Sequence, residues 1–205
     1  HDEGIYVIAR QTVFQDPILA LARPDLALMS SSTGKQWKDH KGVMWIDAAA
    51  KDAWDYNIAI AKDALGRGFD EINFDYIRFS SDGNMNDINY PFWNEKTPKR
   101  QIMRSFFKYL RESLPDTRLS ADMFGYVTIL QDDLGIGQHL DDAFPYFNAI
   151  APMVYPSHYN KGFLNHQNPA DFPYEVVFAS ISEANSRLKQ YIAKAANSTS
   201  TVDYI

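Results

Sequence analysis

The sequence predicts an α/β protein with a parallel β-sheet, and two observations lead to this prediction. Four runs rich in apolar and β-branched residues, expected as strands at 4–10, 70–78, 118–124 and 148–155, have the composition of strands buried on both faces. Segments with apolar residues at helical spacing separate these runs. Strand and helix therefore alternate four times, which is typical of a parallel sheet with helices packed outside it. Four such units fit half of an eight-stranded barrel or a small doubly wound sheet.

Capping residues predict where the helices begin. Asp16–Pro17 is expected to open a short helix, and Asp47 is expected to cap the next one. Thr97–Pro98 places an N-cap residue before a proline at the first helical position. A short helix is expected near 140–144, and the last helix is expected to start near Pro173.

Composition restricts the classes of protein that the chain can represent. Its 205 residues, 45% of them hydrophobic, suffice for one sizeable core, so a single domain over 1–205 is expected. The net charge of -6 argues against a nucleic-acid partner or an anionic membrane surface, because both require concentrated Lys and Arg. The chain has no cysteine, which excludes disulfides and thiolate catalysis, and no apolar run long enough to span a membrane. The tail over 197–205 has no clear pattern and is expected to be disordered.

Polar residues gather at the predicted carboxyl ends of the strands, where parallel α/β folds place their functional groups. Because side chains alternate along a strand, Asn73 and Asp75 share one face of the second strand. Ser120 and Asp122 share one face of the third strand. A single strand-end aspartate has an ordinary alternative role, which is to cap the next loop or to pair with Arg78. Two of them on successive strands favour a shared site.

Two carboxyl groups facing one cavity provide the chemistry of glycoside hydrolysis. One carboxylate attacks or stabilises the anomeric carbon, and the other carboxyl donates a proton to the leaving oxygen. We expect Asp75 to be the nucleophile or ionised stabiliser, because Arg78 is close in sequence. We expect Asp122 to be the general acid, because apolar neighbours such as Met123 would raise its pKa. Arg10 is expected to point toward the same site and keep a carboxylate ionised.

Further side chains are expected to bind the substrate. Trp37, Trp45 and Trp93 fall in predicted loops, where they either stack on sugar rings or pack the loops onto the core. His158 follows the fourth strand and either contacts substrate hydroxyls or has no chemical role. The five histidines form no His-x-His or His-x-x-x-His pair, so neither a metal nor another cofactor is expected. The predicted substrate-binding residues are Arg10, Asn73, Arg78, Trp93, Tyr155 and His158.

Several motifs of the chain occur together in one known family. The longest is FDYIRFSSDG at 74–83, in which Ser80 stands where that family usually has proline. The others are the segment 4–16, SADMFG at 120–125, DLGIGQ at 133–138 and PMVYPSHY at 152–159. Together they resemble a bacterial glycosyl hydrolase domain family, a domain-of-unknown-function group related to barrel glycosidases, over the chain up to about Val177.

The resemblance implies a (β/α) TIM barrel of which this chain holds strands three to six. Asp75 would end strand four and Asp122 strand five, where related glycosidases place catalytic carboxylates, and Tyr155 would lie on strand six. It also implies a carbohydrate substrate and a location outside the cell or in the cell envelope. We therefore expect an incomplete barrel, an open sheet whose first and fourth strands are unpaired edges, and poor solubility of the isolated chain.

Three functions are compared on these grounds. The first is a glycoside hydrolase acting on a poly- or oligosaccharide, and its alternative is a degenerate barrel that binds carbohydrate without cleaving it. A binding module needs aromatic side chains but no carboxyl pair, so the presence of both Asp75 and Asp122 favours the enzyme. The third is a metal-dependent hydrolase, against which the lack of clustered histidines argues.

Overall fold

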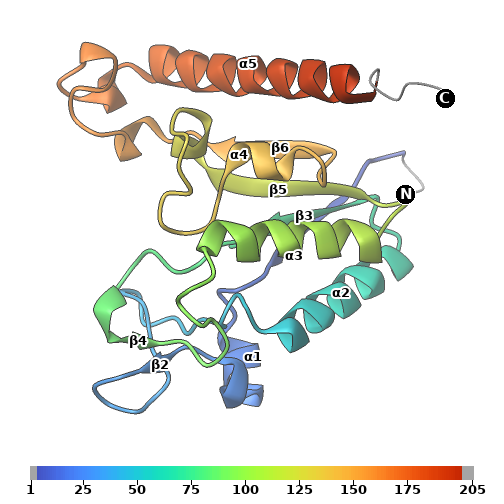
Figure 1. The fold of residues 1–205 in the computed structure, drawn as a ribbon, viewed down its shortest axis with the longest axis vertical. Coiled ribbons are helices and arrows are strands. Elements are labelled where there is room, and N and C mark those ends of the chain that lie inside the picture. The colour runs from blue at the N-terminus through green and yellow to red at the C-terminus, as the bar shows by residue number, and fades with distance from the viewer. Residues whose placement is uncertain (1–3, 200–205) are drawn as a thin grey trace.

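A four-stranded parallel sheet forms the centre of the protein, whose computed structural model describes residues 4–199 (Figure 1). Its strands pair in the order β1-β3-β5-β6, and all three pairings are parallel. The predicted strand order and the mixed α/β class are therefore confirmed. Within the described residues β1 and β6 are the two edges, so the sheet is open, as predicted. The strand bounds are β1 (Ile8–Thr12), β3 (Glu71–Asp75), β5 (Arg118–Phe124) and β6 (Ala149–Met153).

Three strands, β1, β3 and β6, are shorter than the sequence predicts, and the backbone gives the reason for the first two. The prediction starts the first strand at Gly4, but β1 begins at Ile8, because Val7 makes only an isolated pair of hydrogen bonds with Asp70. The prediction extends the second strand to residue 78, but Tyr76 has a positive φ of 53°, which turns the chain out of the strand. This turn makes Asp75 the last residue of β3.

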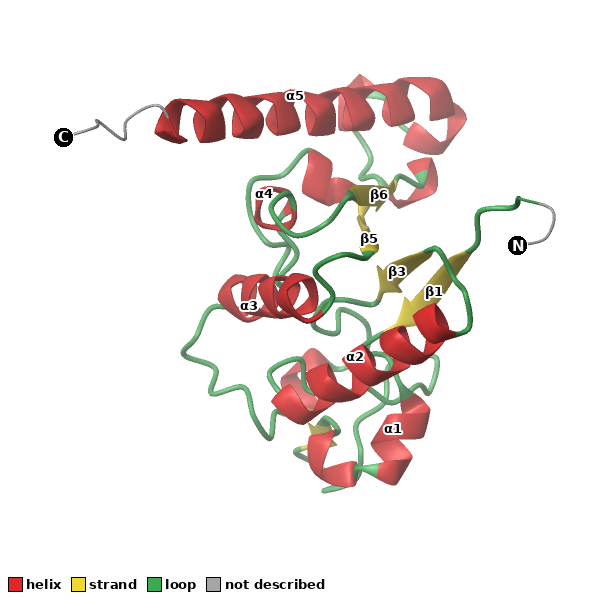
Figure 2. Ribbon diagram, turned by 90° about the vertical axis from the view of Figure 1, so that its right-hand side faces the viewer, coloured by secondary structure: helices red, strands yellow, loops and turns green. Residues whose placement is uncertain are grey.

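Helices cover one face of the sheet (Figure 2). The helix α2 (Lys51–Gly66) contacts β3, and α3 (Lys99–Ser113) contacts both α2 and α4 (Leu140–Ala143). Side chains at alternate strand positions, such as Phe74 and Met123, are fully buried on this face and belong to the core. The predicted helices are therefore present. The short helices are α1 (Pro17–Ala22), η1 (Pro24–Leu26), η2 (Met85–Asp87), η3 (Gly125–Thr128), η4 (Pro156–His158), η5 (Phe163–Asn165) and η6 (Pro169–Asp171).

The last helix, α5 (Pro173–Thr199), lies beyond β6 and packs against α4 and the turns that follow β5 and β6 (Figure 1). Because it includes 197–199, the predicted disordered tail is wrong for those residues, and 200–205 lie outside the described part of the chain. Among residues 4–199, no helix has the length and apolar character needed to cross a membrane. Several apolar side chains of α5 are exposed, namely Tyr174, Val177, Phe178, Ile181, Leu188 and Ile192.

The capping predictions have mixed outcomes. Asp16 caps α1 as predicted, since its carboxylate accepts from two backbone N–H groups of the first turn. The prediction for Asp47 is wrong, because α2 begins after Ala50 and the buried Asp47 carboxylate instead accepts from the backbone N–H groups of Phe92 and Trp93. Pro98, not the residue before it, is the N-cap of α3. The hydrogen bonds from Phe92 and Trp93 to Asp47 join the loop after β1 to the loop after β3.

These two loops form a layer at the carboxyl ends of the strands. Within it, β2 (Met29–Ser30) and β4 (Ile88–Asn89) pair as a small antiparallel sheet. Trp37 and Trp45 are buried in this layer, and the indole N–H of Trp37 donates to the carbonyl of Asn84 at 3.0 Å. Both tryptophans thus pack the loops onto the core, which was the alternative to sugar stacking. The layer encloses one side of the strand ends.

Candidate active site at the carboxyl ends of the strands

Asp75 occupies the point where β3 ends. The left-handed backbone of Tyr76 brings its N–H to Asp75 Oδ1, at 2.7 Å. A positive φ is unfavourable for a bulky residue, and such strained positions persist where the surrounding structure holds them in place. The ring of Tyr76 packs edge-on against buried Trp45, with centroids 5.9 Å apart. The loop layer thus holds the turn that fixes the orientation of Asp75.

One guanidinium joins the two predicted carboxylates. Arg10 Nη2 donates to Asp75 Oδ2, and Arg10 Nε donates to Asp122 Oδ2 at 3.2 Å. The three residues come from adjacent strands β1, β3 and β5 and share the sheet face opposite the helices. The structure therefore brings Arg10, Asp75 and Asp122 together, as their positions in the sequence predict.

The surroundings of the two carboxylates differ from the prediction. Burial raises the pKa of Asp75, and the negative charge of Asp122 adds to this effect, while the Tyr76 N–H and Arg10 oppose it. Ala121 and Met123, which the sequence places next to Asp122, do not surround its carboxylate, because they alternate to the helix-covered face. The Asp122 carboxylate instead accepts from Arg10 and from the side chain of Asn73. Sequence neighbours on a strand are not spatial neighbours of its side chain.

A cleft with a volume of about 610 Å³ opens beside Asp75. Arg10, Tyr155 and His158 line it together with Asp75, and the rings of Tyr155 and His158 lie 5.2 Å apart. Asp122 borders an adjoining cavity of about 520 Å³, which shares Arg10 and Tyr155 with the cleft. Tyr155 is half exposed, so its ring offers a surface to a ligand. The two cavities meet at the Arg10 side chain.

Arg78 contributes to the wall of the cleft from a buried position. Its guanidinium lies over the rings of Trp45 and Phe124, at 4.8 and 4.6 Å from their centroids. It donates to the backbone carbonyl of Phe79 and lies 3.7 Å from the carboxylate of Asp82. Burial lowers the pKa of Arg78. These contacts make Arg78 a support of the turn after β3, with one edge at the cleft.

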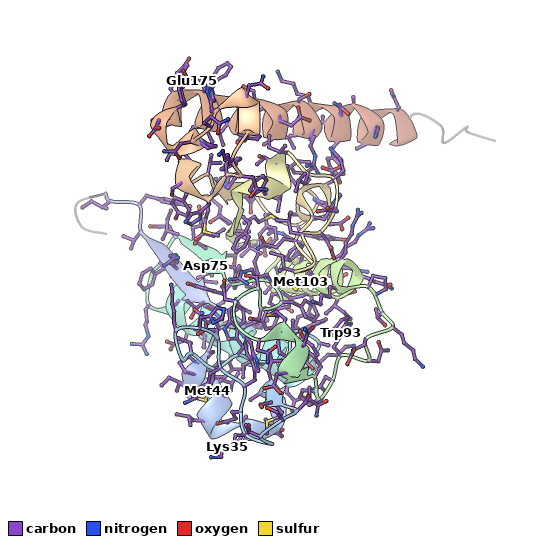
Figure 3. The ribbon with its side chains drawn as sticks, turned by 90° about the vertical axis from the view of Figure 1, so that its left-hand side faces the viewer. Lys35, Met44, Asp75, Trp93, Met103 and Glu175 are labelled. Carbon is purple, nitrogen blue, oxygen red and sulfur yellow. The ribbon has the colours of Figure 1, made fainter. Side chains whose placement is uncertain are left out.

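Trp93 lines neither of the two cavities at the site, although the sequence predicts that it contacts substrate. Figure 3 shows Trp93 apart from Asp75, on the loop that precedes α3. Its ring packs edge-on against Phe79 and Tyr90, and its indole N–H donates to the carbonyl of Thr97 at 2.7 Å. Trp93 therefore packs its loop onto the core, which is the alternative to stacking on a sugar ring.

Other residues that line the cleft are not predicted as site residues from the sequence. Asp39 reaches it from the loop after β1, and its carboxylate accepts from Gln15, from the Trp45 indole and from two backbone N–H groups. Tyr126 and Tyr159 also line the cleft, with their rings stacked and their centroids 4.5 Å apart. Asp39 lies in the loop after β1, and Tyr126 and Tyr159 lie in the turns that follow β5 and β6, where no periodic pattern predicts the course of the chain. Within residues 4–199, no three His, Asp or Glu side chains are grouped so that they could hold a metal ion.

The parallel sheet and the two carboxylates that Arg10 joins at its strand ends define an α/β domain whose site lies at the carboxyl ends of the strands. Residues 1–198 match the model of a family described as "Putative glycosyl hydrolase domain". The chain belongs to this family, and it is a glycoside hydrolase-like domain. No curated protein matches it.

Two solved structures illustrate what the chain is similar to. A hypothetical protein from Ruminiclostridium thermocellum ATCC 27405 is 40% identical, with a TM-score of 0.54 over 66% of this chain and 63% of that one. The glycoside hydrolase domain of PelA from Pseudomonas aeruginosa is 13% identical, with a TM-score of 0.50 over 89% of this chain and 65% of that one. The second likeness concerns the fold alone. The chain thus spans less than two thirds of either structure.

Replacing Asp75 by asparagine should change how thermal stability depends on pH. The raised pKa means that the folded wild type holds the Asp75 proton more tightly than the unfolded chain does, so it loses stability as pH rises from the ordinary carboxyl pKa through the folded value. Asp75→Asn lacks this loss. The Tm of the variant minus that of the wild type should therefore increase between about pH 3 and about pH 7.

The matched control for this measurement is Asp63→Asn on α2. The hydrogen bond from Arg67 lowers the pKa of Asp63, so the same difference should change weakly and in the opposite direction. A Tm difference for Asp75→Asn that stays constant or shrinks with rising pH would show that burial does not control this carboxyl.

Proposed function

We propose that the protein is a glycoside hydrolase that cleaves a poly- or oligosaccharide with Asp75 and Asp122 as its pair of carboxylates. The observation that carries the proposal is the contact of both side chains with one guanidinium, at the strand ends of a glycosyl hydrolase-like domain. One carboxyl would donate a proton to the leaving oxygen, and the other would attack or stabilise the anomeric carbon or activate a water. Arg10 would hold both groups until substrate binds.

The roles of the two carboxylates follow from their surroundings only in part. Two donors, the Tyr76 N–H and Arg10, hold Asp75 in a fixed orientation, as a nucleophile requires. Burial favours its neutral form, which is the property of a general acid. We retain Asp75 as nucleophile or stabiliser and Asp122 as acid, and dependence on the leaving group separates this assignment from its reverse.

The architecture and the ligand contacts complete the proposal. The four strands would be strands three to six of a (β/α) barrel, consistent with their parallel order and with helices on one face. Tyr155 and His158 would contact sugar at the cleft, and Arg78 would shape its wall. A location outside the cell or in the cell envelope belongs to the same proposal and rests on the family resemblance alone.

One observation favours the alternative, a carbohydrate-binding module without activity. All four oxygens of the two carboxylates accept a hydrogen bond, from Arg10, Tyr76 and Asn73. A site that keeps both carboxylates fully engaged after substrate binds would have no free group for proton transfer. Binding of oligosaccharide without release of reducing ends would identify this second function.

Asp122→Asn in the full-length protein tests the assignment of the acid. After a screen of polysaccharides for release of reducing ends, the variant should lose about 10²–10⁴-fold in turnover on a substrate with a poor leaving group. It should retain much more activity on an aryl glycoside whose leaving group needs no proton. Near-normal turnover on the poor leaving group would exclude Asp122 as the acid, and loss on both substrates would reverse the two roles.

A further inference from the structure

A continuous chain of hydrogen bonds crosses the open face of the sheet toward Asp122. It begins at Glu71, which lies on the same face of β3 as Asn73 and Asp75. Glu71 Oε1 accepts from the hydroxyl of Ser120 at 2.5 Å, and Glu71 Oε2 accepts from the hydroxyl of Tyr6 at 2.7 Å. Glu71 and Ser120 are both buried. A buried carboxylate with this set of donors is not an ordinary surface group.

The direction of each hydrogen bond in this chain is determined. Burial acts to raise the pKa of Glu71, but the bonds from Ser120, Tyr6 and Arg118 outweigh it and lower that pKa, so Glu71 is an ionised acceptor. The hydroxyl proton of Ser120 must therefore point to Glu71, which leaves a lone pair of Ser120 facing Asn73. Asn73 Nδ2 donates to Ser120 Oγ at 3.1 Å and to Asp122 Oδ1 at 3.2 Å.

The amide of Asn73 has one acceptable orientation as a result. If its oxygen replaced its nitrogen, that oxygen would face two acceptors, the lone pair of Ser120 and the carboxylate of Asp122. Asn73 borders neither of the two cavities at the site, although the sequence predicts it to contact substrate. Its contacts are with the protein.

We propose that Glu71, Ser120 and Asn73 are positioning residues, which together hold Asp122 in one orientation through a directed hydrogen-bond relay. Oδ1 of Asp122 accepts a hydrogen bond from Asn73, and Oδ2 accepts one from Arg10. Once substrate displaces Arg10, Oδ2 is the oxygen that contacts substrate. This inference rests on the proposed function in its use of Asp122 as a catalytic carboxyl. It adds two residues, Glu71 and Ser120, that line neither of the two cavities at the site.

The other groups that face Asp122 are few, so the contribution of the relay is measurable. Arg10 on β1 and Asp75 on β3 are the charged groups next to it among the described residues. On the side of β6 and α5, the cavity that it borders is lined by Tyr155 and by apolar side chains including Val177 and Ile181. Among residues 4–199, Asn73 is the only uncharged side chain that donates a hydrogen bond to the Asp122 carboxylate.

Ser120→Ala in the full-length protein breaks the relay, and Ser120→Thr restores the hydroxyl. The titration of the Asp122 carboxyl carbon is followed by NMR, with Asp122→Asn to assign its signal. In Ser120→Ala the freed Asn73 amide no longer holds one orientation, so the midpoint should move to higher pH. The alkaline limb of the pH profile of kcat/KM, which deprotonation of the general acid controls, should move with it. The value of kcat/KM should fall roughly tenfold to a hundredfold, because the acid is no longer held in one orientation. Ser120→Thr should stay close to the wild type in all three measurements.

Asn73→Ala provides the same test if Ser120→Ala does not fold, since it removes the donor to Asp122 directly. An Asp122 titration that is unchanged in a folded relay variant would overturn the proposal, because a merely structural role leaves the midpoint in place. Failure of the proposed function is seen separately. If wild type cleaves no polysaccharide, or Asp122→Asn keeps normal turnover, Asp122 is not catalytic, while the NMR titration still decides whether the relay positions it.

Discussion

Asp75→Asn is expected to reduce turnover of the full-length protein by about 10³-fold while leaving the fold intact. Asparagine has the shape of the aspartate and can still accept from the Tyr76 N–H, but it can neither attack an anomeric carbon nor carry a negative charge beside it. The loss should appear both on a substrate with a poor leaving group and on an activated aryl glycoside. A nucleophile or ionised stabiliser is required in either case.

Two further results would change this interpretation. Activity that persists on the aryl glycoside alone would make Asp75 the general acid, in agreement with the burial that raises its pKa. Near-normal turnover on both substrates would remove Asp75 from the catalytic site. Asp63→Asn serves as the control for the substitution itself, because Asp63 is an exposed residue of α2 paired with Arg67 and should keep full activity.

The fold was predictable because its signals are local and repeated. Each strand of the parallel sheet is a short apolar run, and the order of the strands follows from right-handed crossovers through the helices. The ends of the elements were less predictable. The left-handed backbone of Tyr76 and the role of Asp47 depend on contacts with the loop layer, which no periodic pattern reveals.

The central part of the candidate site was predictable for the same reason. Parallel strands bring their carboxyl ends to one edge, so Arg10, Asp75 and Asp122 had to lie near one another. Their electrostatic surroundings were not predictable, because these depend on residues that are distant in sequence. The sequence predicts that Asn73 and Trp93 contact a ligand, but Asn73 donates to Asp122 and Trp93 packs against Phe79.

The loop after β5 joins the candidate site to the helix layer through one glycine. Phe79 N–H donates to the carbonyl of Ile136 at 2.9 Å, and the side chain of Gln138 accepts from Phe124 N–H at 2.9 Å. Between them, Gly137 has a φ of +83°, and a Cβ added to it would lie 2.5 Å from Met103 Cγ and 2.9 Å from the carbonyl oxygen of Lys99. Both the backbone and the space around it therefore require glycine at this position.

Gly137→Ala should lower the free energy of unfolding by about 2–5 kcal/mol, from about 1–2 kcal/mol for the left-handed conformation and about 1–3 kcal/mol for overpacking against α3. Gly135→Ala is the matched control, because Gly135 also has a positive φ, of +65°, but no heavy atom lies within 4 Å of its added Cβ. It should cost only the conformational part, about 1–2 kcal/mol. Thermal and urea unfolding of the full-length protein measure both variants. Equal losses in the two would show that the loop moves away from Met103 without cost, and that the loop is not held tightly against α3.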